Sequence, residues 1–254
     1  MSRELTPQEI AERSLIKTYR KSIWNPFIAA VKRYELVSPG DKIAVCISGG
    51  KDSVMLAKLM QELQRHTDRP FELVFMVMDP GYKPENRNLI EDNAALLGIP
   101  ITIFDSDIFN VTVSAEKNPC YLCARMRRGF LYAKAQELGC NKIALGHNRD
   151  DIIETFMMSL IFEARISTFQ PVSFLEKKKL FSIRPLMYVP ESDIKGYIRK
   201  NNLPIIKNPC PANGNTKRQE MKDLIKDLCR KYDNADTKIF NAISRSKIDG
   251  WSKE

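Results

Sequence analysis

The sequence predicts an α/β fold in which a doubly wound, mostly parallel sheet carries helical additions at both ends of the chain. Short apolar runs alternate with longer segments of helical spacing, and two polar motifs that begin with Ser-Gly or Gly-His directly follow such runs. The 254 residues are 43% hydrophobic, which is enough to bury a core. No apolar run approaches the ~18–20 residues needed to span a bilayer.

The elements follow from these patterns in chain order. Thr6, Pro7 and Glu9 form a helix start with a capping box, and the helical stretch runs to about residue 34. Helices are predicted where apolar residues recur three or four positions apart. Buried strands are predicted where short apolar runs lie between turn residues. The strands cover residues 42–48, 71–78, 101–104 and 142–146, and the helices cover residues 52–66, 86–97, 121–138 and 149–163.

A hairpin and three helices are predicted for the last third of the chain. The three lysines of residues 177–179 mark the hairpin tip, residues 182–184 a further strand, and residues 190–201, 216–232 and 235–248 helices. We therefore expect an N-terminal helical extension (1–40), a central α/β domain (41–206) and a basic C-terminal helical region (207–254).

Positive charge is concentrated in one part of the chain. The formal net charge is +9, and residues 171–231 contain 14 Lys/Arg against six Asp/Glu. A solvated helical surface would explain a short basic run, but a bias over such a length favours a polyanion such as nucleic acid. Arg125, Arg127 and Arg128 add to this charge.

The N-terminal residues include acids and lack an apolar segment, which argues against a secretory signal. We therefore expect a cytoplasmic protein with no membrane association. Six cysteines are too few for a disulfide scaffold, so clustered cysteines point to metal binding or chemistry.

A phosphate-binding turn is predicted directly after the first strand. Paired glycines let backbone N–H groups approach an anion, and the following helix N-terminus adds further donors. The Walker A pattern is not met, because Val45 replaces its first glycine and Asp52 follows the lysine. An acid there suits a magnesium ion bound to phosphate oxygens. The predicted loop consists of Ser48, Gly49, Gly50, Lys51, Asp52 and Ser53.

A second polar motif, Gly146-His147-Asn148-Arg149-Asp150-Asp151, follows the fourth predicted strand and opens a helix. It should therefore lie on the same sheet edge as the first loop. Its two acids either cap the helix or handle magnesium or a proton during nucleotide activation.

Three cysteines form the third candidate site. Cys120 and Cys123 make a C-x-x-C pair, which alone fits a redox pair, half of a zinc site or chance. The Asn-Pro-Cys sequence ending at Cys120 recurs at Cys210. Three thiolates are one ligand short of a structural zinc site, which takes four. They suit a [4Fe–4S] cluster in which one iron has no cysteine ligand. Cys46, Cys140 and Cys229 are assigned to packing.

The SGGKDS loop resembles the pyrophosphate loop of the N-type ATP pyrophosphatases, the PP-loop superfamily. Together with CYLCARMRRGFLY, GHNRDD, the Arg184-Pro185-Leu186 segment and the single later cysteine, residues 42–228 resemble the tRNA 2-thiocytidine synthetases. The resemblance implies an adenine nucleotide α-hydrolase-like fold and cleavage of ATP to AMP and pyrophosphate. It also implies adenylation of the C2 oxygen of an anticodon-loop cytidine, which sulfur then replaces.

The same resemblance implies roles for single residues. It places ATP and Mg²⁺ at residues 48–53 and makes Asp52, Asp151 and Arg127 catalytic. We also expect Met78, at the end of the second strand, to contact adenine, and Gly146 to lie in the nucleotide site. The resemblance assigns the [4Fe–4S] cluster to Cys120, Cys123 and Cys210. The implied partners are tRNA and a sulfur donor, either a cysteine desulfurase or sulfide, and a homodimer is compatible with the sequence.

One departure from the family pattern leaves the target base open. Cys210 is followed by Pro-Ala-Asn, where relatives commonly have a second cysteine. The alternatives are another PP-loop tRNA-modifying enzyme, such as a 2-thiouridine or lysidine synthetase, and a non-catalytic basic RNA-binding protein.

Overall fold

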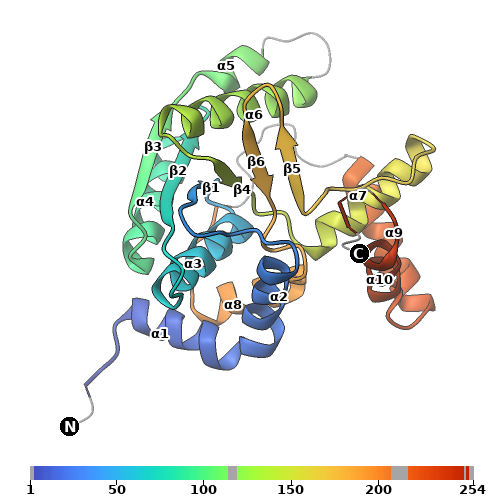
Figure 1. The fold of residues 1–254 in the computed structure, drawn as a ribbon, viewed down its shortest axis with the longest axis horizontal. Coiled ribbons are helices and arrows are strands. Elements are labelled where there is room, and N and C mark those ends of the chain that lie inside the picture. Colours follow the sequence, from blue (N-terminus) through green and yellow to red (C-terminus); the bar gives the residue numbers. More distant parts are fainter. Residues whose placement is uncertain (1–2, 114–118, 207–216, 249, 252–254) are drawn as a thin grey trace.

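The computed structural model describes residues 3–113, 119–206, 217–248 and 250–251, and a six-stranded sheet lies at its centre (Figure 1). The strand order is β3-β2-β1-β4-β6-β5, with β5 antiparallel to β6 and every other pairing parallel. This confirms the predicted mostly parallel sheet. The strands are β1 (Lys42–Ile47), β2 (Glu72–Asp79), β3 (Ile101–Asp105), β4 (Lys142–Ala144), β5 (Val172–Leu175) and β6 (Leu180–Ile183).

Helices cover both faces of the sheet because the side chains of its central strands alternate. Ile43 and Val45 of β1 belong to the large core that includes α3 (Lys51–Arg65) and α4 (Pro84–Leu97). Ala44 points to the other face, where α6 (Pro119–Glu137) packs. The strand order reverses at β1 and β4, and open α/β sheets bind ligands at the carboxyl ends of strands at such a point.

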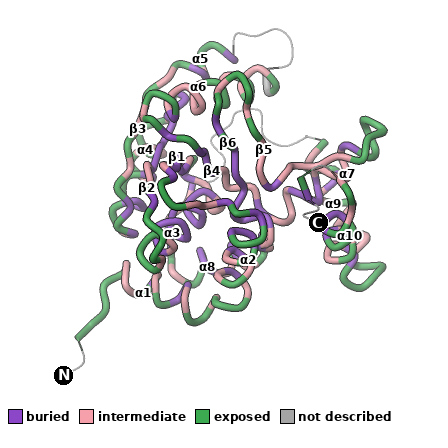
Figure 2. Tube along the Cα trace, viewed as in Figure 1, coloured by how far each residue is buried: buried purple, intermediate pink, exposed green. Residues whose placement is uncertain are grey.

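The remaining helices surround this frame, with buried residues concentrated on the strands and on the helix sides that face them (Figure 2). None of the helices in the described ranges is long and apolar enough to cross a membrane. The remaining helices, besides α3, α4 and α6, are α1 (Pro7–Arg13), α2 (Asn25–Arg33), α5 (Ile108–Val113), α7 (Arg149–Phe162), α8 (Glu191–Lys200), α9 (Lys217–Lys231) and α10 (Ala235–Arg245).

The predicted ends of several elements are confirmed. Thr6 and Glu9 form the capping box of α1, and Gly98 caps α4 in the left-handed conformation that favours glycine. The turn at residues 177–179 joins β5 to β6 as expected. The helical stretch to residue 34 is not one α-helix, because two π-helical turns, Ser14–Thr18 and Arg20–Trp24, separate α1 from α2. Pro26, which has no N–H to donate, lies in the first turn of α2.

Candidate active site

The turn between β1 and α3 is shaped as a phosphate-binding loop. Gly49 has a φ of +77°, and Gly50 is the N-cap residue of α3. The Ser53 hydroxyl accepts a hydrogen bond from the Ser48 N–H (3.1 Å) and donates to the Gly50 carbonyl (2.8 Å). These bonds fix the turn, so the free N–H groups at the start of α3 are presented to one point, as an anion requires.

Lys51 lies between two carboxylates at this turn. Its Nζ is 2.7 Å from Asp52 Oδ2 and 2.9 Å from Glu191 Oε1. Burial opposes its charge, but the two carboxylates outweigh burial and raise the pKa of Lys51 to about 12. The lysine is therefore a permanent cation. Glu191, the first residue of α8, was not singled out in the sequence, because nothing local marks a residue that reaches the site from a separate helix.

The second motif meets the first in space, although 96 residues separate Asp52 from Asn148. Asn148 Nδ2 donates to Asp52 Oδ1 at 3.0 Å. Gly146 lies against the first turn of α3, where an added β-carbon would be 3.2 Å from the Asp52 carbonyl carbon and 3.3 Å from the Ser53 nitrogen. The two predicted loops thus form one site at the carboxyl edge of the sheet.

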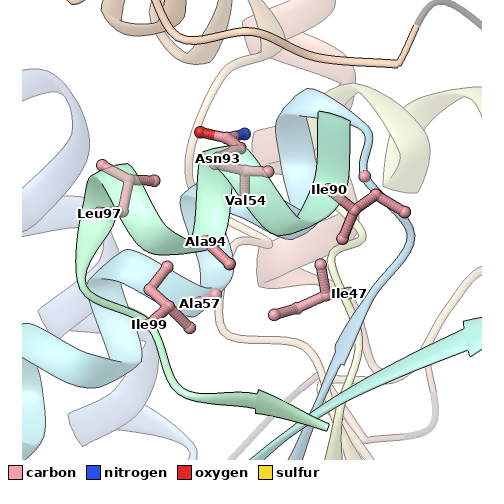
Figure 3. A pocket seen from close by; sticks show the side chains of 9 residues that line it. Ile47, Val54, Ala57, Ile90, Asn93, Ala94, Leu97 and Ile99 are labelled. Atoms are coloured by element: carbon pink, nitrogen blue, oxygen red, sulfur yellow. The ribbon is translucent and has the colours of Figure 1, made fainter. Parts of the chain in front are cut away.

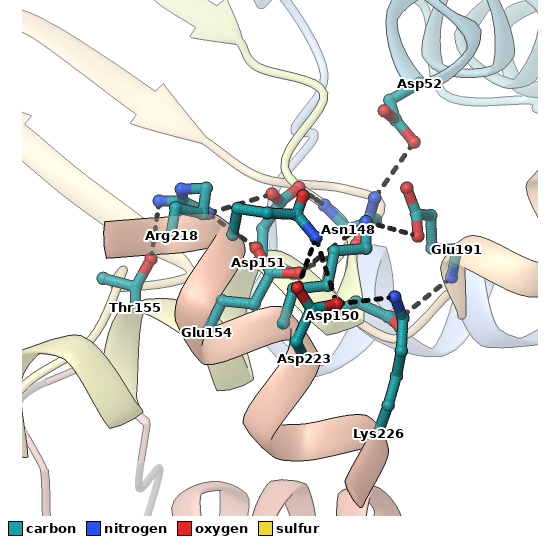
Figure 4. Close-up of polar contacts among 12 residues, drawn as sticks. Asp52, Asn148, Asp150, Asp151, Glu154, Thr155, Glu191, Arg218, Asp223 and Lys226 are labelled. Carbon is teal, nitrogen blue, oxygen red and sulfur yellow. Dashed lines mark hydrogen bonds and ion pairs between the residues drawn. The ribbon is translucent and has the colours of Figure 1, made fainter. Parts of the chain in front are cut away.

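The two adjacent acids of the second motif have different surroundings (Figure 4). Asp150 accepts the N–H of Glu191 (2.8 Å) at the start of α8, which is a structural role. Asp151 Oδ2 accepts the N–H of Asn148 (3.0 Å) in the capping box of α7, while Oδ1 faces Arg218. Burial raises the pKa of Asp151 and the Arg218 charge opposes that rise. Helix capping therefore accounts for Asp150, whereas Asp151 both caps and reaches the site.

His147 is a neutral residue in this structure. Its ring stacks on Phe169 with centroids 4.3 Å apart, and its Nδ1 has no hydrogen-bond partner among the described residues. Burial lowers its pKa to about 3, and the charges of Arg184, Arg218 and Arg128 act in the same direction. An imidazole with so low a pKa does not hold a proton near neutral pH, so His147 is not suited to be a general base.

The C-x-x-C helix reaches the phosphate loop through Tyr82. The Tyr82 hydroxyl donates to the Ser48 carbonyl oxygen at 3.4 Å. Burial raises the pKa of Tyr82, and Arg127 and Cys123 are close enough to shift it further in opposite directions. Cys123 on α6 is a free, partly buried thiol. Arg127 and Cys123 are thus near Tyr82, which itself contacts the phosphate loop.

Two of the three expected cluster ligands are described incompletely or not at all. Cys120 is the second residue of α6, but its side chain lies outside the described residues, as does all of Cys210. Described residues on either side of the Cys210 segment contact the site. The Ile206 N–H donates to the Gly49 carbonyl oxygen at 3.0 Å, and Arg218 contacts Asp151.

The approach of Ile206 to the phosphate loop depends on α4. Asn93 of α4 donates to the Pro204 carbonyl at 2.8 Å, which holds the chain just before Ile206. An added β-carbon at Gly49 would lie 2.5 Å from Ile206 Cδ1, so the contact requires glycine there. The small cavity beside these residues, between α3 and α4, is lined almost entirely by apolar side chains and belongs to the core (Figure 3).

The residue expected beside adenine, Met78, is buried. It is 3% exposed and belongs to the buried core of the protein. The next residue, Asp79, ends β2 and accepts the N–H groups of Gly81 (2.9 Å) and Tyr82 (2.6 Å), which shapes the turn beside the site. An adenine contact at Met78 stays a prediction.

Comparison with known proteins agrees with this geometry. A family model described as a PP-loop domain matches residues 17–228. The chain belongs to the PP-loop family. Within it the chain groups with tRNA-cytidine(32) 2-sulfurtransferases: it is 36% identical to that of Bordetella pertussis over 94% of this chain and 76% of the relative. The corresponding protein of Pelobacter propionicus is 33% identical, over 94% of this chain and 90% of the relative.

A solved structure shares the fold of this PP-loop protein. The U34-tRNA thiolase NcsA from Methanococcus maripaludis, determined with its [4Fe-4S] cluster, superposes with a TM-score of 0.70 at 24% identity. The match covers 87% of this chain and 77% of that chain. The adenine nucleotide α-hydrolase-like fold expected from the sequence is thereby confirmed.

The close contact at Gly146 predicts a sensitive position. In Gly146→Ala the added methyl group forces the two loops of the PP-loop site apart, so we expect the affinity for ATP to fall roughly tenfold. Isothermal titration of ATP measures this change. Gly129→Ala is the matched control, because no atom lies within 4 Å of a β-carbon there. Equal affinities in both variants would contradict the assigned contact.

The low pKa of His147 predicts acid sensitivity. The unfolded chain takes up a proton near pH 6.5 and the folded chain only near pH 3, so stability is full above pH 6.5 and decreases as the pH falls. Wild-type protein should lose about 2 kcal/mol more than His147→Gln between about pH 7.5 and pH 5. Urea unfolding at both pH values measures this difference.

His66→Gln is the control for this experiment, since His66 is the other histidine of the chain and has a side chain 56% exposed. It should keep the wild-type acid sensitivity. If wild type and His147→Gln lose the same stability, the buried neutral histidine is refuted.

Proposed function

We propose that this PP-loop protein is a tRNA-thiolating enzyme that uses ATP to exchange the C2 oxygen of an anticodon-loop cytidine for sulfur. The observation that carries the proposal is the junction at Tyr82, which contacts Ser48 of the PP-loop and lies close to Cys123 and Arg127 of the cysteine helix. This junction supports a common location for nucleotide activation and sulfur chemistry. The tRNA-cytidine(32) 2-sulfurtransferases, at 33–36% identity over 94% of the chain, support the same target, cytidine 32.

The first reaction step is adenylation. The C2 oxygen attacks the α-phosphorus of ATP, the bond between the α-phosphorus and the bridging oxygen breaks, and pyrophosphate leaves. The N–H groups of the loop, Ser48, Ser53 and the fixed charge of Lys51 bind the leaving pyrophosphate. Asp52 and Asp151 offer carboxylate oxygens, the ligands that Mg²⁺ prefers, and would hold the ion against the phosphates.

The second step replaces the activated oxygen by sulfur. The C2–S bond forms, the C2–O bond breaks, and AMP leaves with the oxygen. Cys120, Cys123 and Cys210 would hold a [4Fe–4S] cluster whose fourth iron is open to an external sulfur. The free thiol of Cys123 and the contacts of both flanks of the Cys210 segment with the site fit this ligand set. We assign to Arg127, which lies near Tyr82, the stabilisation of negative charge on the reacting nucleotide.

The proposed partners are tRNA and a sulfur donor, either sulfide or a cysteine desulfurase. Arg125 and Arg128 are exposed on α6 and suit RNA phosphates. The homodimer stays a prediction from the sequence. A second candidate substrate is uridine, because the fold relative NcsA is a U34-tRNA thiolase. Mass spectrometry of nucleosides from the tRNA of a deletion strain identifies the modified base.

The cluster assignment predicts that substitution of a ligand cysteine affects thiolation but not ATP binding. Cys120→Ala, Cys123→Ala and Cys210→Ala should each abolish thiolation while ATP binding persists, because each removes a ligand that the other two cannot replace. The readouts are thiolated nucleosides after complementation and the visible absorbance of protein purified without oxygen. Thiolation retained in any one of the three would exclude the cluster assignment.

Cys46→Ala serves as the control. Cys46 lies within β1, and burial raises the pKa of its thiol to about 12, so it is protonated and unsuited to ligate iron. This variant should keep nearly full activity.

The adenylation step predicts that Lys51 is essential for pyrophosphate release. Lys51→Ala removes a fixed charge from the leaving group and should lower the rate by about 10²–10³-fold. A pyrophosphate release assay with tRNA measures it. Lys195→Ala is the matched control, because Lys195 contacts the same Glu191 carboxylate from an exposed position. Equal losses in both variants would assign the effect to Glu191 rather than to the phosphate.

A further inference from the structure

Arg218, in the first turn of α9, contacts three side chains of α7 (Figure 4). Its Nη1 is 3.2 Å from Asp151 Oδ1 and 3.1 Å from Glu154 Oε2, and its Nη2 donates to Thr155 Oγ1 at 3.1 Å. Residues three and four apart share one face of a helix, so the guanidinium lies along the face of α7 that begins at Asp151. No sequence motif marks Arg218.

A second cation of α9 extends this contact to the PP-loop. Lys222 follows Arg218 by one turn, and its Nζ is 2.8 Å from Glu191 Oε2. Glu191 in turn contacts Lys51 at 2.9 Å. Helix α9 is therefore attached to the site on both sides, through Asp151 of the second loop and through Glu191 and Lys51 of the first.

The contact with Asp151 restrains the orientation of its carboxyl group. Asp151 Oδ2 is already held by the Asn148 N–H, so a second bond at Oδ1 fixes the rotation of the group. A guanidinium is planar and carries several N–H donors in fixed directions, so Nη1 can contact both carboxylates while Nη2 is held by Thr155. Glu154, with a side chain only 6% exposed, needs cations for its own charge, and Arg218 is the nearer of two, with Lys222 Nζ at 3.9 Å. Arg218 therefore has both a structural and an orienting contact.

We propose that Arg218 is a positioning residue of the adenylation site, which holds the Asp151 carboxylate in the orientation the reaction uses. Helix α9 is then part of the active site, and its first turn does not serve as a contact for RNA phosphates. The inference rests on the proposed function, because it assigns Arg218 a part in the same adenylation step.

Two variants separate the orienting role from the structural one. Arg218→Met removes the contacts with both carboxylates and with Thr155, while Arg218→Met combined with Glu154→Gln also removes the charge that needed compensation. We expect the single variant to lower kcat for tRNA-dependent pyrophosphate release by about 10²-fold, with the KM for tRNA within about twofold. The double variant should recover the melting temperature and leave kcat low. Arg218→Lys should recover activity only in part, because a lysine does not hold two carboxylates in a fixed geometry.

Arg230→Met is the matched control, since Arg230 lies on the same helix with a side chain 78% exposed. It should leave kcat unchanged. The proposal is overturned if kcat returns together with the melting temperature in the double variant, which would make Arg218 purely structural. It is also overturned if Arg218→Met raises the KM for tRNA and leaves kcat unchanged, as a phosphate contact would.

Binding of Mg²⁺-ATP separates this inference from the proposed function. If wild-type protein released no pyrophosphate with any tRNA, the proposed function would fail. The affinity of the same variants for Mg²⁺-ATP still tests Arg218 in that case. It should fall about tenfold in Arg218→Met and in the double variant and stay unchanged in Arg230→Met. An unchanged affinity in Arg218→Met would then refute the positioning role.

Discussion

The close contact between the β1–α3 loop and the β4–α7 loop is the constraint on which the rest of the site depends. Gly146 packs against the backbone of Asp52 and Ser53, and Asn148 donates to the Asp52 carboxylate. Parallel strands β1 and β4 are neighbours, so their carboxyl ends meet at one edge. This contact brings the phosphate-binding N–H groups, the fixed cation Lys51 and two acids within reach of one nucleotide.

The C-terminal part of the chain completes this arrangement through charge. Lys51 has two carboxylate partners, of which Glu191 comes from α8, and Glu191 is shared with Lys222 of α9. Such alternating charges stabilise one another only when all are in place, because a buried carboxylate without a partner is costly. Ile206 and Arg218, which lie on either side of residues 207–216 in the sequence, contact the two loops of the site.

The basic residues of the C-terminal region do not all face solvent, because some form ion pairs within the protein. Its charge surplus suggested contact with RNA, yet Arg218 and Lys222 are directed at acids of the protein itself. Net charge over a segment describes its long-range field and not the direction of any side chain. Likewise, the sequence does not distinguish the adjacent acids Asp150 and Asp151. In the structure Asp150 accepts the N–H of Glu191 at the start of α8, whereas Asp151 accepts the N–H of Asn148 in the second loop of the site.

Local patterns located β1, β2, β3, β4 and β6 to within two residues, together with the capping of α1 and α4 and the two polar loops, because each depends on residues within a few positions of one another. They gave no range for β5 and did not predict α5. Those patterns also placed residues 48–53 and 146–151 at one sheet edge, through the known geometry of parallel strands. They could not reveal Tyr82, Glu191 or Arg218, whose contacts join elements distant in the chain. Side-chain partners of that kind arise from packing, and a single sequence carries no local signal for them.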